Sequence, residues 1–115
     1  MKEVSKTINY KGRDYKLVFN LNVMEVIQEE YKTVNAWGEL TDGKSGEVDV
    51  KALKFGFAAM LNEGIDIDNE DNGTNTPFLT LKQVGRMLTD LGANQVTEDM
   101  NEVVIESIKS DEKKA

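Results

Sequence analysis

Histidine and cysteine are both absent from this chain of 115 residues, and proline occurs once. Without imidazole or thiolate groups the sequence excludes Ser/His/Asp triads, cysteine nucleophiles, disulfide bonds and the usual zinc sites. Any enzyme built from these residues would depend on carboxylates, lysine, tyrosine or hydroxyl groups. The sequence therefore excludes the catalytic mechanisms that depend on histidine or cysteine.

Long hydrophobic runs are lacking as well. No stretch approaches the roughly 20 apolar residues that span a bilayer, and the first residues lack the apolar core of a secretory signal. With 39% hydrophobic and 30% charged residues, the composition is typical of a globular chain. We expect a single domain over residues 1–115, located in the cytoplasm and without a membrane partner.

Positive charge is also in short supply, because 14 basic residues face 21 acidic ones and the formal net charge is −7. Nucleic-acid binding needs a dense stripe of lysine and arginine, since neutralised phosphates supply most of the affinity. The basic residues that gather near the N-terminus fit a short, solvated hairpin better than such a stripe. The sequence therefore predicts no nucleic-acid partner.

Residues 4–20 show the alternation of apolar and polar positions that is typical of a β-hairpin, with Lys11 and Gly12 at its centre. A two-residue turn at this pair predicts the register, which is Val4 with Phe19, Lys6 with Leu17, Ile8 with Tyr15 and Tyr10 with Arg13. The apolar residues of both strands then share one face. Because an isolated hairpin is marginal in water, that face must pack against helices.

Four later segments have helical spacing of apolar residues, and we predict helices over about residues 22–32, 49–63, 80–91 and 97–109. The candidate N-caps are Asn22, Asp49, Thr80 and Thr97. A short turn of helix anchored by Trp37 and Leu40 is expected before a flexible loop. Gly64 is placed to end the second long helix, so residues 64–79 are predicted to form a polar loop and residues 110–115 a frayed tail. The fold class is α+β, an N-terminal antiparallel hairpin packed on a bundle of about four α-helices.

Two short patterns invite other functions. An EF-hand register starting at Asp68 puts Leu79 where the bidentate glutamate belongs, so a solvated acidic loop is the preferred interpretation of residues 63–72, with a cation site as the open alternative. Residues 38–45 satisfy the bare G-x-x-x-x-G-K-S pattern, but no buried strand precedes them and no helix opens directly after them. We expect no enzymatic activity, no cofactor and no metal ion.

The order of elements resembles a known family. The segments that carry the likeness are TINYKGRDYKL at residues 7–17, LNVMEVIQE at 21–29, LKFGFAAML at 53–61 and LTLKQVG at 79–85. Together they are similar to the tail assembly chaperones of long-tailed bacteriophages and related prophages. The likeness covers most of the chain. Its motifs are degenerate in sequence and identify a fold-like pattern, not an active site.

The resemblance implies a non-enzymatic protein of the bacterial host cytoplasm that binds the tape-measure protein and keeps it soluble while the tail tube assembles. It implies absence from the mature virion, with the tail tube protein as a further partner. Apolar helix surface that a small interior leaves uncovered is, separately, available to a second copy. An apolar helix face would cover the partner's apolar stripes. The expected contact residues are Met100, Val104 and Ile108, followed by Ile27 and Tyr31. The alternative is a small tail or head–tail connector structural protein, which would persist in purified particles.

Overall fold

The hairpin is the element that the sequence predicts in most detail. The computed structural model describes residues 4–44 and 46–112, in which β1 (Val4–Tyr10) and β2 (Arg13–Phe19) form a two-stranded antiparallel sheet. All four predicted residue pairs are confirmed. Lys11 and Gly12 both have positive φ, 51° and 78°, as the tight turns that suit a twisted hairpin require.

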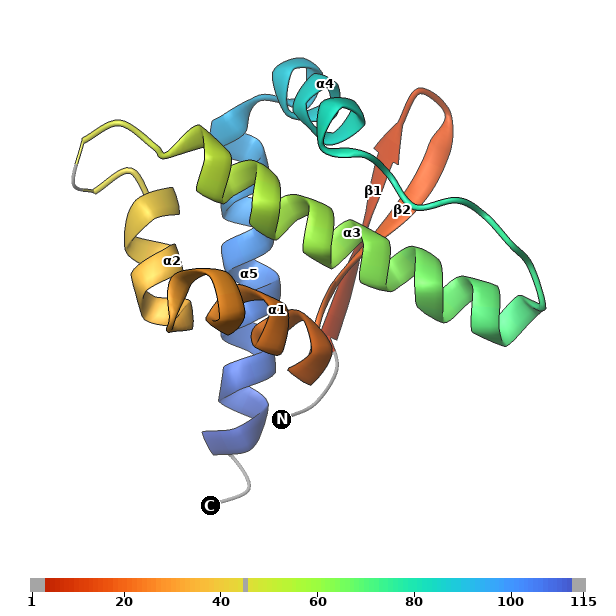
Figure 1. The fold of residues 1–115 in the computed structure, drawn as a ribbon, viewed down its shortest axis with the longest axis horizontal. Helices are drawn as coiled ribbons and strands as arrows, with labels where there is room; N and C mark the ends of the chain where they lie inside the picture. Colours follow the sequence, from red (N-terminus) through yellow and green to blue (C-terminus); the bar gives the residue numbers. More distant parts are fainter. Residues whose placement is uncertain (1–3, 45, 113–115) are drawn as a thin grey trace.

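Five helices follow the hairpin in the described residues and confirm the α+β class (Figure 1). They are α1 (Leu21–Tyr31), α2 (Val34–Thr41), α3 (Val50–Asn72), α4 (Leu81–Leu91) and α5 (Ala93–Glu112). In Figure 1 the long α3 crosses in front of α5, with α1 and α2 on one side of it and α4 on the other. Buried side chains from both strands and all five helices, among them Phe19, Trp37, Phe57 and Met100, form one core.

The start of α1 and the whole of α2 differ from the prediction. Asn20, not Asn22, caps α1, because its side-chain oxygen accepts a hydrogen bond from the Val23 backbone N–H at 3.1 Å. The expected short turn is a complete helix, α2, in which Trp37 is buried and donates from its ring nitrogen to the Ala52 carbonyl at 2.9 Å. Leu40 is exposed and is not an anchor. Thr41 is buried instead, since it lies one turn after Trp37 on the same face.

The predicted end of the helix at Gly64 is wrong. Asp49 caps α3 as expected, but the helix runs on for 23 residues and ends at Gly73, whose φ of 64° is left-handed. Gly64 lies inside the helix, where a Cβ atom would sit 2.4 Å from the Lys16 carbonyl oxygen. Glycine at this position thus permits close contact with β2. Residues 63–72, expected as a loop, are helical, and the polar connection shortens to residues 73–80.

The last two helices are separated by Gly92 alone. Thr80 and Gln83 form the predicted capping box of α4. Helix α5 begins at Ala93, four residues before Thr97, so the prediction that Thr97 opens it is wrong. Buried Val96 extends the inward face of α5 by a turn. At the other end, residues 110–112 of the expected tail are helical, and residues 113–115 lie outside the described part of the chain.

Candidate protein-binding surface

Most of the predicted contact residues are interior. Met100, Val104 and Ile27 are only 1%, 8% and 0% exposed, and all three belong to the core. They cannot touch a partner in this conformation. Ile108 is exposed on α5, whereas Tyr31 is half-buried and meets Phe55 edge to face, with 5.6 Å between ring centroids. The structure therefore does not bring these five residues together into one surface.

Other apolar side chains do reach the surface. Val26, Val50, Phe78 and Leu81 are between 40% and 64% exposed. They come from α1, α3, the connection at residues 73–80 and α4, and all four border the outward side of α3. Sequence reasoning missed all of them. The available signal was an aromatic residue, Phe78, in an otherwise polar connection.

Two hollows that share no lining residue open along the outward side of α3, and we call the surface that contains both of them the α3 trough. Its floor residues recur at helical spacing and are Lys51, Phe55, Ala59, Asn62 and Asp66. One wall carries Val26 of α1. The opposite wall carries Phe78 and Leu81. With a rise of 1.5 Å per residue, the floor is about 22 Å long.

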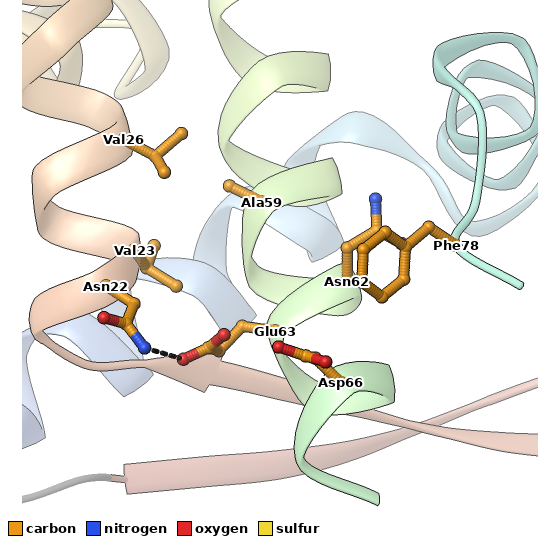
Figure 2. A pocket seen from close by; sticks show the side chains of 8 residues that line it. All are labelled: Asn22, Val23, Val26, Ala59, Asn62, Glu63, Asp66 and Phe78. Atoms are coloured by element: carbon orange, nitrogen blue, oxygen red, sulfur yellow. Dashed lines mark hydrogen bonds between the residues drawn. The ribbon is translucent and has the colours of Figure 1, made fainter. Parts of the chain in front are cut away.

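The half of the trough nearer the C-terminal end of α3 contains a hollow of about 180 Å³. Figure 2 shows Val26 and Phe78 on opposite sides of α3, with Ala59, Asn62 and Asp66 between them. For comparison, an engineered apolar cavity of about 150 Å³ holds a benzene molecule. The hollow is therefore large enough to admit one aromatic or branched aliphatic side chain.

Two asparagines of α3 fix the wall that carries Phe78. The side chain of Asn62 accepts from the Leu79 N–H at 2.8 Å and donates to the Leu79 carbonyl at 3.1 Å. Asn69 makes the same pair of contacts with Thr76, at 3.0 and 2.9 Å. These hydrogen bonds hold the connection against α3 on both sides of Phe78. The exposed ring is therefore carried by a backbone segment that is fixed to α3.

The other half of the trough contains a second hollow, of about 280 Å³, lined by Val50, Lys51, Lys54, Phe55 and Leu81. Phe55, one of these lining residues, packs against the Tyr31 ring. Burial, with Asp49 and Glu30 nearby, raises the pKa of the Tyr31 hydroxyl above its usual value. The tyrosine is thus neutral at physiological pH and acts as an apolar support.

Charge divides the trough along its length. Lys51 and Lys54 lie at one end and Glu63 and Asp66 at the other. None of these four forms an ion pair with another residue in the described ranges 4–44 and 46–112. The Glu63 carboxylate instead accepts from the side-chain amides of Asn20 at 2.6 Å and Asn22 at 2.9 Å, the second of which is drawn in Figure 2. None of the four charges is therefore neutralised by an ion pair within the described residues.

The alternatives considered from the sequence find little geometric support. Among the described residues, no three acidic side chains are grouped so that they could hold a metal ion. The first four residues of the G-x-x-x-x-G-K-S pattern are in α2, where their backbone belongs to a helix and cannot form a phosphate loop, and Ser45 lies outside the described residues. Nor, within the described part, is any helix long and apolar enough to cross a membrane.

Comparisons of the chain with models of known protein families, with curated proteins and with solved structures find no match in any of the three.

Proposed function

We propose that the protein is a non-enzymatic tail assembly chaperone of a long-tailed bacteriophage or prophage, which binds the tape-measure protein and keeps it soluble during tail tube assembly. The observation that carries the proposal is the α3 trough, where four large apolar side chains stay exposed on one side of a domain whose net charge is −7. Exposed apolar patches with polar rims are typical of protein-binding sites. The negative charge favours solubility of the complex.

The test is co-expression in bacteria of this chain with the tape-measure protein encoded in the same phage or prophage genome. We expect the chaperone to copurify with the tape-measure protein and to raise the soluble fraction of that protein several-fold. An unrelated acidic protein of similar size serves as the control. A tape-measure protein that stays insoluble and does not copurify contradicts the proposal.

The alternative, a structural protein of the tail or the head–tail connector, differs in where the chain ends up. We place the chaperone in the host cytoplasm and outside the mature virion, with the tail tube protein as a further partner. Mass spectrometry of purified particles separates the two functions. Stoichiometric amounts of this chain in mature virions would favour the structural protein.

A further inference from the structure

We infer that the α3 trough docks a single amphipathic helix of defined charge polarity, with basic residues at the end that lies over Glu63 and Asp66. The inference rests on the proposed function, since it takes this helix from the tape-measure protein. It adds the location of the binding site and the sequence features of the segment that is bound.

The dimensions of the trough match a helix of about four turns. Its floor, from Lys51 to Asp66, extends about 22 Å, which an α-helix covers with about 15 residues. Ala59 lies at the middle of the floor, where its small side chain permits close approach of a ligand backbone. A helix that lies between Val26 and Phe78 would bury a stripe of apolar residues at i, i+3, i+4 and i+7.

The two hollows fix the spacing of the anchor side chains. The α3 residues that line them are centred about ten positions apart, which corresponds to about 15 Å along the helix axis. Two positions of a ligand helix that are eleven residues apart are separated by about 16 Å and lie on the same face. We therefore expect two large apolar anchors at i and i+11, one for each hollow.

The four charges of the trough, none of them ion-paired within the described residues, set the orientation of the bound helix. Glu63 and Asp66 favour lysine or arginine above them, and Lys51 and Lys54 favour aspartate or glutamate. The reversed orientation would place like charges together. Exposed apolar residues elsewhere, such as Ile105 of α5, do not line either hollow and lack this pairing with charges of both signs.

The binding segment can be found with labelled peptides of about 20 residues that tile the tape-measure protein, measured by fluorescence anisotropy against the full chain. Phe78→Glu and Val26→Glu are each expected to weaken binding of the peptide found in this screen at least tenfold. Ile105→Glu, a matched change at a side chain of similar exposure outside the trough, should leave the affinity within twofold. Circular dichroism and urea denaturation establish that each variant is folded.

The charge polarity has its own test. The double variant Lys51→Glu/Asp66→Lys reverses one charge at each end of the trough and so cancels the net charge of both ends. It should bind the natural peptide several-fold more weakly than the unmodified chain does, and should bind a peptide with exchanged acidic and basic residues several-fold more tightly. Equal preference of both proteins for both peptides overturns the assigned polarity.

Failure of this inference is distinguishable from failure of the proposed function. If the intact tape-measure protein copurifies but no peptide binds, or if Phe78→Glu binds as well as Ile105→Glu, the trough is not the site and the chaperone function stands. If the tape-measure protein does not copurify at all, the function itself fails. A dimer in light scattering that Phe78→Glu dissociates and Ile105→Glu does not would assign the trough to a second copy and overturn the inference.

Discussion

Gly64 illustrates how the same residue can carry two structural meanings. In the sequence it is a helix terminator, because glycine is common just after the last turn. In the structure it lies within α3, where the Lys16 carbonyl of β2 approaches so closely that any side chain would collide with it. The contact that gives Gly64 its role joins residues 48 positions apart, so local sequence cannot reveal it.

Gly64→Ala should therefore destabilise the fold by roughly 1–3 kcal/mol, because backbone atoms of α3 and β2 must separate to admit the new methyl group. Gly38→Ala is the matched control, since nothing lies within 4 Å of the added carbon in α2. That change should be neutral or stabilising by up to about 1 kcal/mol, as alanine is the better helix former. Urea denaturation followed by circular dichroism measures both. Equal stability of the two variants would contradict the close contact.

The apolar residues of α5 fall into a buried group and an exposed group, and the two groups should differ in their effect on stability. Met100→Ala is expected to lower the free energy of unfolding by about 2–5 kcal/mol, because it leaves a cavity in the core. Ile108→Ala, at an exposed position of the same helix, should change it by no more than about 0.5 kcal/mol. A large loss at Ile108 together with a small one at Met100 would show that the inward face of α5 has been misassigned.

Helix α4 shows what sequence reasoning achieves at the scale of an element. Its start is defined by reciprocal hydrogen bonds between the Thr80 hydroxyl and the Gln83 N–H, at 3.2 Å, and between the Gln83 side chain and the Thr80 N–H, at 2.8 Å. Both partners lie within four residues of each other. The signal is therefore complete in the local sequence, and the predicted boundary is confirmed.

Loss of this cap has a measurable cost. Thr80→Ala should reduce stability by about 0.5–2 kcal/mol, because the first turn of α4 loses a hydrogen-bond acceptor. Thr89→Ala is the control within the same helix. Within residues 4–44 and 46–112, its hydroxyl donates to the Gly85 carbonyl one turn earlier and to no other group. Removal of the hydroxyl should be neutral or slightly stabilising. Thermal denaturation of both variants makes the comparison, and a larger loss at Thr89 would contradict it.

The boundaries that were predicted wrongly have a shared cause. Helix α3 passes through Gly64, and α5 starts before Thr97, because core contacts of Ile65 and Val96 extend helical structure beyond the local signal. Helical stability in proteins comes mostly from packing of an apolar face, so tertiary contacts override weak local preferences. Strong side-chain caps such as Asp49 hold their positions because they act within one turn.

At the scale of the whole molecule, polar side chains of the hairpin fasten it to three helices. The pairs are Lys6 with Asp99 and Glu102 of α5, Tyr10 with Asp90 of α4, and Lys16 with Asp68 of α3. Hydrogen bonds to Glu102 and Asp99 raise the pKa of the Lys6 ammonium above its usual value. The hydrogen bond to Asp90, with some burial, raises the pKa of the Tyr10 hydroxyl. Both links hold only while the hairpin partner is protonated.

These shifts predict a loss of stability in alkaline solution. The folded state raises the pKa of Lys6. The contribution of its interactions with Asp99 and Glu102 to the free energy of unfolding is therefore complete below the unfolded pKa of 10.5 and declines as the pH rises above that value. The stabilising contribution of Tyr10 likewise declines as the pH rises above 10.0, the ordinary pKa of its hydroxyl. Lys6→Met should therefore be less stable than the unmodified chain at pH 8, and the difference should shrink above about pH 10.5.

Urea denaturation of the unmodified chain and Lys6→Met at pH 8, 10 and 11 measures this dependence. Lys82→Met serves as the control, because Lys82 is an exposed lysine of α4 for which no ion pair with another described residue is found. Its effect on stability should be small and should not vary with pH in the same way. A difference for Lys6→Met that stays constant across the range would contradict the raised pKa.

The sequence by itself determined the α+β class, the hairpin with its register and the capped starts of α3 and α4. Each of these depends on interactions between residues that are near one another in the chain. Only the tertiary structure decided which apolar residues are covered. Met100 and Phe78 are both large and apolar, yet one is core and the other lines the α3 trough, because burial depends on neighbours that are distant in sequence and brought close only by folding.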